Sequence, residues 1–254
     1  MQTDQADYAR PAQPVNGDGM AIVKTQEEIA ALKRAAKATG KAFVHALPLI
    51  RAGVTERQIA DAMEEYSLWL PGVEGLAFPA IVASGPNGAQ PHAELTDRVL
   101  EDGDLVTIDF GVMFRGYASD MTRTFMIGAP AETQKNIYES VRRAQAAGVA
   151  AAKAGVSCAE VDAVCRNLIT DDGFGEYFIH TTGHGVGAEV HEDPRLAAAS
   201  EAVLEAGMVV TIEPGIYIEG LGGVRIEDTV VITEKGCTVI TPGIPKGIDS
   251  LKNP

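Results

Sequence analysis

Two apolar segments of this chain each end in a carboxylate, and the two segments are copies of each other. The segment that ends at Asp109 aligns without gaps on the segment that ends at Glu213, at a constant offset of 104 (213 − 109). Each copy then runs through a glycine-containing turn to a second acid, Asp120 in the first and Glu227 in the second. This spacing is the reach of a hairpin that returns beside its start. Four acids in two related hairpins indicate one site where the halves meet.

These acids, together with one histidine, form a set of hard ligands suited to divalent cations. The candidate metal ligands are Asp109, Asp120, His184, Glu213 and Glu227. Such a set favours Mn²⁺, Fe²⁺, Co²⁺ or Mg²⁺ over a structural zinc site, which prefers thiolates and imidazoles. Four clustered carboxylates without cations would repel one another and stay partly protonated. We therefore expect two divalent metal ions, with Mn, Co or Fe ahead of Zn, about 3.5–4 Å apart as in two-metal hydrolases.

The repeat extends into the segments that must position these side chains. Residues 52–55 match residues 154–157 at an offset of 102, and in both copies a hydroxyl residue opens a capping box. Each copy follows a long Ala-rich pattern with helical spacing, over about residues 25–47 in the first half and 132–153 in the second. Each half is thus predicted to contain helix, turn, helix and then β-hairpins.

Histidines follow a glycine-containing loop in each half. Residues 78–88 lead to His92, and residues 180–187 lead to His191, so these two histidines are expected to be counterparts. The Gly183-His184-Gly185-Val186-Gly187 run matches no phosphate-binding fingerprint and is interpreted as a tight turn. His45 is interpreted as structural. His180 fits either a structural or a functional role, and the structural role is favoured.

A repeat of about 100 residues is too long for a solenoid unit. It predicts an α+β fold of duplicated half-domains, related by a pseudo-two-fold, with antiparallel sheet covered by helices. Because no Ser/Thr-rich linker separates the halves, residues 21–254 are predicted to form one domain, after a flexible tail over residues 1–20.

Composition limits the partners that the chain can be expected to have. A net charge of −14 argues against a nucleic-acid-binding surface, which needs a basic patch. The sequence contains neither an apolar run of membrane-spanning length nor an N-terminal apolar segment typical of a secretion signal. We therefore expect a cytoplasmic protein with no nucleic-acid or membrane partner, and the sequence leaves open whether it forms a homodimer.

The motifs around the candidate ligands resemble those of the pita-bread metallopeptidases, family M24, from about Thr25 to the C-terminus. The motifs are Thr107–Gly111, Ser119–Thr124, Gly183–Gly187, His191–Pro194, Thr211–Gly215 and Val224–Asp228. Within that superfamily the chain is similar to the branch of Xaa-Pro aminopeptidases and prolidases. That branch shares the loop Ser84-Gly85-Pro86-Asn87-Gly88 and the Arg225-Ile226-Glu227-Asp228 pattern. Members of the branch usually carry a separate N-terminal domain, which is absent from this sequence.

The resemblance implies a role for each site residue. Asp120 and Glu227 would bridge the two metals, Asp109 would complete one of them, and His184 and Glu213 would complete the other. His92 and His191 would be catalytic residues at the scissile region of the substrate, and Glu213 would shuttle a proton to the leaving nitrogen. Arg225 would orient the ligand carboxylates.

The expected activity is that of a dinuclear-metal exopeptidase that hydrolyses the N-terminal bond of peptides, with Xaa-Pro bonds as the leading substrate. A methionine aminopeptidase is the first alternative, because members of that group have a single-domain architecture. Creatinase-like C–N hydrolysis and a non-catalytic peptide- or protein-binding module of the same fold are the others.

Overall fold

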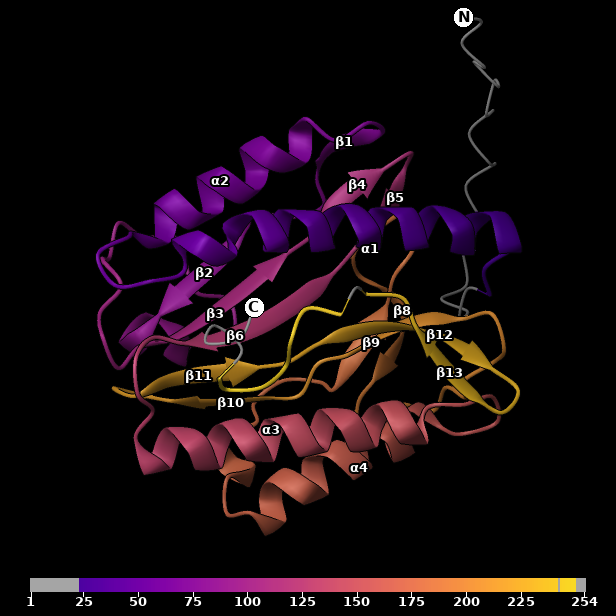
Figure 1. The fold of residues 1–254 in the computed structure, drawn as a ribbon. Coiled ribbons are helices and arrows are strands. Elements are labelled where there is room, and N and C mark those ends of the chain that lie inside the picture. Colours follow the sequence, from indigo (N-terminus) through magenta and orange to yellow (C-terminus); the bar gives the residue numbers. More distant parts are fainter. Residues whose placement is uncertain (1–22, 242, 250–254) are drawn as a thin grey trace, which may run out of the picture.

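The computed structural model describes residues 23–241 and 243–249, so the tail predicted over residues 1–20 lies outside the described residues. The first half of the chain forms two helices followed by six short strands (Figure 1). Its elements are α1 (Gln26–Ala46), η1 (Leu47–Leu49), α2 (Glu56–Leu68), β1 (Val73–Leu76), β2 (Ile81–Ser84), η2 (Gly85–Ala89), β3 (Leu105–Phe110), β4 (Val112–Phe114), β5 (Tyr117–Ala118) and β6 (Met121–Met126).

The second half repeats this order of helices and strands. Its elements are α3 (Glu132–Ala151), α4 (Cys158–Asp171), η3 (Gly175–Tyr177), β7 (Gly183–Gly185), β8 (Glu192–Leu196), β9 (Val209–Ile212), β10 (Gly215–Ile218), β11 (Gly222–Arg225), β12 (Asp228–Thr233) and β13 (Gly236–Val239). The isolated bridge between Thr55 and Val99 recurs between Ser157 and Val203. The duplication predicted from the sequence is therefore confirmed in three dimensions.

The predicted capping boxes start the helices. Thr25, Thr55 and Ser157 each accept a hydrogen bond from the backbone N–H three residues on, and the Glu or Gln side chain at that position accepts one from the backbone N–H of the cap residue. Helix α1 ends at Ala46, one residue before the predicted end, and α3 ends at Ala151 rather than near Lys153. The helices therefore begin where local side-chain chemistry satisfies their free N–H groups.

All of the strand pairings in the described residues are antiparallel. The main sheet of the first half has the order β2-β3-β6, and that of the second half has the order β13-β12-β9-β7-β8. Two small sheets, β1-β4-β5 and β10-β11, extend them. In each half the strand that leads to the first acid, β3 or β9, is paired on both sides, so the backbone that carries the acid is fixed.

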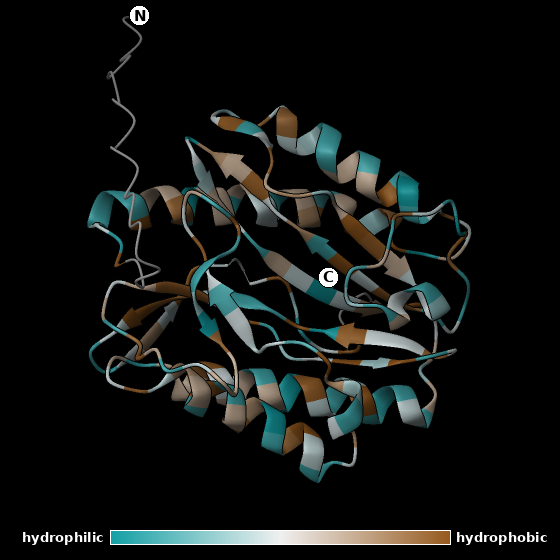
Figure 2. Cartoon of the chain, turned by 180° about the vertical axis from the view of Figure 1, so that it is seen from behind, coloured by the Kyte–Doolittle hydropathy of each residue, from teal (hydrophilic) through white to brown (hydrophobic). Residues whose placement is uncertain are grey.

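The sheets lie between two helix pairs, with α1 and α2 over the first half and α3 and α4 over the second (Figure 1). Hydrophobic and hydrophilic stretches alternate along these helices, as expected for amphipathic helices with one buried face (Figure 2). Each half has its own buried apolar cluster between its helices and its sheet. These features confirm the predicted α+β architecture of two half-domains, each with antiparallel sheet covered by helices.

Within the described residues, no helix combines the length and the apolar character needed to cross a bilayer.

Hydrogen bonds join the two halves directly behind the acids. The Thr124 hydroxyl donates to the Arg225 carbonyl and accepts from the Arg225 backbone N–H. The N–H of Glu227 donates to the carbonyl of Thr122 at 3.2 Å. The positions of acids from opposite halves are thereby coupled.

Candidate metal centre

Strand register brings the four acids together. Asp109 lies near the end of β3 and pairs with Thr122 of β6, and Asp120 directly precedes β6. In the second half, Glu213 directly follows β9 and Glu227 directly precedes β12. Since β9 and β12 pair antiparallel from Ile212 and Asp228, the second pair of acids also meets at one end of its sheet.

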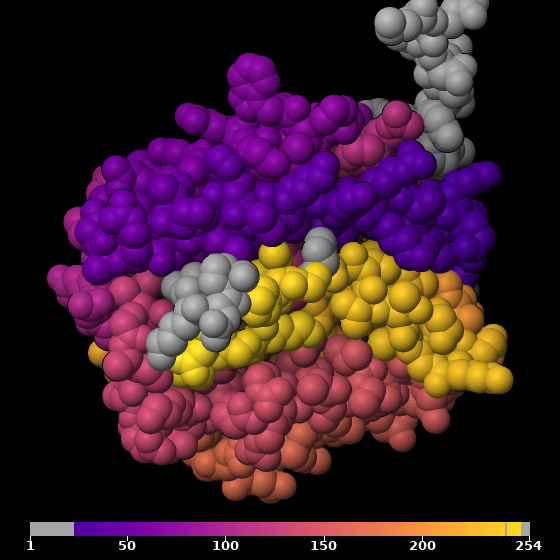
Figure 3. Space-filling model, viewed as in Figure 1, coloured from indigo at the N-terminus to yellow at the C-terminus, as the bar shows by residue number. Residues whose placement is uncertain are grey.

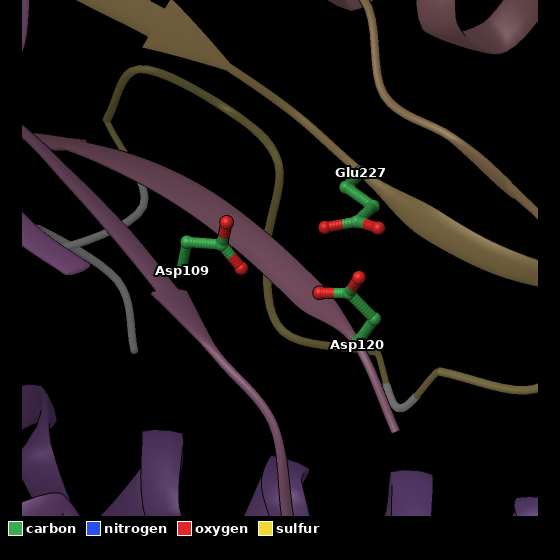
Figure 4. Close-up of side chains that lie close together, drawn as sticks. All are labelled: Asp109, Asp120 and Glu227. Carbon is green, nitrogen blue, oxygen red and sulfur yellow. The ribbon is translucent and has the colours of Figure 1, made fainter. Parts of the chain in front are cut away.

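Three of these acids form a compact cluster. Asp109, Asp120 and Glu227 each present a carboxylate oxygen such that the three atoms lie within 4.8 Å of one another. Figure 4 shows the three carboxylates turned toward a common space between strands of both halves. One oxygen of each, Asp109 Oδ1, Asp120 Oδ1 and Glu227 Oε1, is buried without a hydrogen-bond partner. Buried polar atoms are normally paired, so three unpaired anionic atoms aimed at one another match the donor set of a cation site.

Burial and mutual repulsion perturb the acids strongly. The pKa of Asp120 is raised well above its ordinary value by burial and then by the charges of Glu227 and Asp109. The pKa of Glu227 is likewise raised by burial and then by Glu213 and Asp109. Glu213 is different: burial raises its pKa, but the hydrogen bond and charge of protonated His184, with the charges of His180 and Arg225, together outweigh burial and leave the pKa lowered in the metal-free site. Divalent cations would reverse the shifts of the first two groups by favouring their ionised forms.

His184 lies beside the acids with one ring nitrogen directed at them. Its Nδ1 is 3.0 Å from the carbonyl oxygen of Gly185, which can only accept, so Nδ1 carries the proton in the neutral ring. Its Nε2 lies 3.0 Å from Glu213 Oε1 and 3.6 Å from Asp120 Oδ2. The nitrogen left with a free lone pair in the neutral ring is therefore the one that faces the carboxylates, as a metal ligand must.

The interpretation of the run around His184 as a tight turn is wrong. Gly183–Gly185 forms strand β7, which lies between β9 and β8 in the five-stranded sheet. An added Cβ at Gly183 would lie 2.0 Å from the carbonyl oxygen of Thr211, and one at Gly185 would lie 2.2 Å from that of Asp193. The glycines allow close backbone approach, which keeps His184 4% exposed on a strand that is paired on both sides.

Arg225 links the ligand acids to the wall of the site. Its Nη2 donates to Asp109 Oδ2 at 2.7 Å, and its Nη1 donates to the Tyr217 hydroxyl at 2.8 Å. The Tyr217 hydroxyl is 2.9 Å from Nε2 of His180, whose Nδ1 lies 2.8 Å from the carbonyl oxygen of Thr181. Since that carbonyl requires a proton on Nδ1, the Tyr217 hydroxyl donates to Nε2 of neutral His180. The result is an ordered hydrogen-bond chain from a cavity wall to Asp109.

A cavity of about 400 Å³ opens over the acids. Its lining includes His92, His180, His184, His191, Asp109, Asp120, Glu213 and Arg225, with Phe78, Pro79 and Ile81 as an apolar wall. The rings of His184 and His191 lie 4.3 Å apart between centroids. Burial, followed by the charges of His184 and Arg195, lowers the pKa of His191, which keeps its ring neutral at pH 7. Glu227 does not line the cavity and is buried behind it.

The structure therefore brings together all of the predicted site residues and leaves His45 aside. His45 stacks on Tyr66 at 4.3 Å between ring centroids, away from the cavity lining. The structural role favoured for His180 is wrong, since this residue lines the cavity, and sequence analysis missed Tyr217 and Arg195 as members of the site. Arg195 is the Cα partner of His184 across β7 and β8, so its position depends on a register that the sequence does not display.

A family comparison decides how this centre is classified. The model of metallopeptidase family M24 matches residues 30–234, which include all five candidate ligands. The chain belongs to metallopeptidase family M24. Divalent metal ions are the cofactors of this family, and the unpaired oxygens of Asp109, Asp120 and Glu227 fit that cofactor.

Its M24 relatives include Xaa-Pro dipeptidases. The chain is 49% identical over 220 residues to a Xaa-Pro dipeptidase of Pyrococcus furiosus, covering 87% of this chain and 63% of that protein. A solved Xaa-Pro dipeptidase of Bacillus anthracis is 48% identical with a TM-score of 0.87, over 90% of this chain and 64% of that one. An X-Pro aminopeptidase of Thermotoga maritima is 41% identical with a TM-score of 0.85, over 89% of this chain and 64% of that one. The chain thus spans less than two thirds of these relatives.

Proposed function

We propose that this chain hydrolyses the first peptide bond of short peptides whose second residue is proline, with two divalent cations as cofactors. The observation that carries the proposal is the set of three buried carboxylate oxygens without partners, at the base of a histidine-lined cavity. The names of the similar M24 proteins support proline as the second residue. The proposed metal ligands are Asp109, Asp120, His184, Glu213 and Glu227, with Mn²⁺, Co²⁺ or Fe²⁺ as the cations.

Bound cations would supply a water that deprotonates near neutral pH and a Lewis acid for the scissile carbonyl. Glu213 is the proposed proton carrier, because its carboxylate lines the cavity beside Asp120 and His184, where the substrate would bind. Its Oε1 also accepts a hydrogen bond from the Thr211 hydroxyl at 2.9 Å, which fixes the carboxylate.

His92 and His191 lie in the cavity lining, where each can donate a hydrogen bond to the substrate. The nitrogen that leaves an Xaa-Pro bond has no N–H, so a nearby donor must protonate it directly. The wall of Phe78, Pro79 and Ile81 offers an apolar surface of the kind that a proline ring would contact. Arg225 and its hydrogen bond to Asp109 would keep that ligand oriented.

The test of this function is a peptide panel offered to the protein loaded with Mn²⁺ or Co²⁺. Ala-Pro and Ala-Pro-Ala represent Xaa-Pro substrates, Ala-Ala is the matched peptide without proline, and Met-Ala-Ser represents the methionine aminopeptidase alternative. We expect release of the residue before proline and loss of the activity with a chelator. Cleavage of Met-Ala-Ser alone would favour the alternative, and no cleavage by metal-loaded protein would contradict a peptidase function.

His191→Ala is expected to lower kcat on Ala-Pro by about 100-fold, since one positioned hydrogen-bond donor to the transition state contributes on that order, while two metal ions stay bound. Asp120→Asn removes a ligand from the buried cluster and should lose bound metal and activity together. Metal content by atomic emission, measured beside the kinetics, separates the two classes. Full metal content and normal turnover in Asp120→Asn would overturn its assignment as a ligand.

A further inference from the structure

A buried carboxylate in the first half lies outside the metal centre and has an unusual set of partners. Glu56 is the first residue of α2 and is 0% exposed. In the described residues it forms no ion pair with a lysine, arginine or histidine. A buried carboxylate is costly unless hydrogen bonds compensate it. An interaction with the helix dipole does not require burial, so it does not by itself explain why Glu56 is buried.

The partners of Glu56 come from the two ends of one loop. Ser84 donates its backbone N–H and its hydroxyl to Glu56 Oε1, both at 2.7 Å. Thr96, 12 residues further on (96 − 84), donates its hydroxyl at 2.5 Å and its backbone N–H at 3.2 Å to Oε2. Asn87 donates from Nδ2 to both oxygens, at 3.2 and 3.0 Å. One carboxylate thus joins the start and the end of the loop formed by residues 84–96.

This loop is the one that carries His92 to the cavity. Asn87 also donates to the carbonyl oxygen of Glu94 at 3.2 Å, which braces the loop internally. At its tip, the carbonyl oxygen of Pro91 accepts from Arg225 Nη1 at 3.0 Å. Arg225, which also contacts Asp109, thus fixes the residue next to His92. Glu56 of α2 fixes the two ends of the same loop.

The second half fixes its corresponding loop with a carboxylate at a different position. The residue that the repeat places opposite Glu56 is Cys158 (56 + 102), which cannot do this. Asp162, one turn later in α4 and 0% exposed, accepts instead from the backbone N–H and the hydroxyl of Thr182. Its partner Arg166 donates to the carbonyl oxygen of His180. Both halves therefore use a buried acid of their second helix to fix the loop that delivers a cavity histidine.

We infer that Glu56 is a positioning residue for His92: it fixes residues 84–96 so that the imidazole meets the substrate at the metal centre. The activity part of this inference rests on the proposed function, and its structural part does not. Glu56→Gln tests it, because glutamine has nearly the same shape but replaces one carboxylate oxygen by an NH₂ group. That group cannot accept the hydrogen bonds that Ser84 or Thr96 donates to the oxygen in the wild type. Glu65→Gln is the matched control, being the same substitution at an exposed site of the same helix.

The first readout is hydrogen exchange of the metal-loaded protein. We expect amide exchange in residues 84–96 to be about tenfold faster or more in Glu56→Gln. In the wild type, opening of this loop must break the hydrogen bonds to the carboxylate, and the variant lowers the free energy of that opening. Exchange in α2 should stay unchanged, and Glu65→Gln should match the wild type. An unchanged rate in residues 84–96 would overturn the inference. Thr96→Val, which removes only the hydroxyl donor, gives the same test with a smaller effect if Glu56→Gln does not fold.

The second readout is a double-mutant cycle on Ala-Pro, with metal content measured for each variant. Glu56→Gln is expected to lower kcat/KM about tenfold with both metals retained, and to change it less than about twofold in a His92→Ala background, because coupled residues are not additive. A further tenfold loss in the His92→Ala background would show that Glu56 acts elsewhere. Absence of wild-type activity on every peptide would contradict the proposed function alone, and hydrogen exchange would still decide the role of Glu56.

Discussion

At the scale of single residues, the acidic cluster favours function over stability. Asp120 and Glu227 have raised pKa values because they are buried and face other acids, so the ionised forms that a cation needs are unfavourable without one. The three buried carboxylate oxygens without hydrogen-bond partners also destabilise the metal-free fold. Removing one acid should therefore help the metal-free fold while it damages the cation site.

This conflict predicts a pH dependence of the metal-free protein. Because the folded-state pKa of Asp120 is raised, folded protein binds more protons than unfolded protein, and the free energy of unfolding falls as pH rises from about 4 through the raised pKa. Asp120→Asn cannot ionise, so its curve should be flatter. We expect it to be more stable than wild type at pH 8 by about 1 kcal/mol or more, as measured by urea unfolding with a chelator present.

Asp61→Asn, the same substitution at an exposed position of α2, is the control and should follow the wild-type curve. Addition of Mn²⁺ should reverse the order of wild type and Asp120→Asn, since only wild type keeps the complete ligand set. If metal-free wild type and Asp120→Asn showed the same pH dependence, Asp120 would not be the strained acid that its burial implies.

The residue scale also shows what sequence could and could not predict about the site. The four acids were identifiable because the repeat places Asp109 on Glu213 and leads each copy to a second acid. Tyr217, Arg195 and Glu56 were not, since the repeat places Met113 opposite Tyr217 and Cys158 opposite Glu56, and neither can take the same role. Their roles depend on contacts between distant segments, such as Tyr217 with His180, that neither copy of the repeat signals.

At the scale of elements, β7 depends on two glycines that let its neighbours approach. A Cβ at Gly183 would overlap backbone of β9, which cannot move without disturbing the strand that leads to Glu213. We predict that Gly183→Ala lowers the free energy of unfolding by about 2 kcal/mol or more and weakens metal binding. Chemical unfolding and titration with Mn²⁺ measure the two effects.

Gly236→Ala is the control for this prediction. Gly236 begins β13 of the same sheet, and nothing lies within 4 Å of a Cβ added there. Its effect on stability should stay within about 0.5 kcal/mol. Equal stability of the two variants would mean that β7 adapts to a side chain and that close approach is not the reason for Gly183.

Elements differ in how far the sequence predicts them. The helices that follow Thr25, Thr55 and Ser157 were predicted from their capping boxes, because the signal lies within four consecutive residues. Strand β7 was missed, because three residues rich in glycine have no strand signal of their own. Their strand conformation comes from pairing with β8 and β9, whose residues lie further along the chain.

At the scale of the whole molecule, a buried ion pair and the C-terminal segment join the halves. Arg123 of β6 pairs with Asp228 of β12 at 3.0 Å, and each side chain is 1% exposed. Arg123 also donates to the carbonyl oxygens of Glu227 and Ile244, and Lys246 pairs with Asp228. In Figure 3 the C-terminal segment, in yellow, lies between the surfaces of α1 and α3. This contact region couples both halves to the backbone of Glu227.

We predict that Arg123→Met lowers the free energy of unfolding by about 3 kcal/mol or more. The substitution removes one of the two cationic partners of the buried Asp228 carboxylate, so that only Lys246 still pairs with it. Arg142→Met, which breaks an exposed pair with Glu139 on α3, should change it by about 1 kcal/mol or less. Urea unfolding at pH 7 measures both. Similar values for the two variants would mean that the buried pair adds nothing to the joint between the halves.

The division of the candidate ligands between the halves also has a consequence for biosynthesis. Asp109 and Asp120 leave the ribosome about a hundred residues before Glu213 and Glu227, a delay of several seconds at ordinary elongation rates of about 5–20 residues per second. During that interval a nascent chain could offer a cation only two acids, in a sheet without its partner. Tight capture of the cation pair would therefore be a late event, which would follow translation and would make the loaded state a marker of a finished chain.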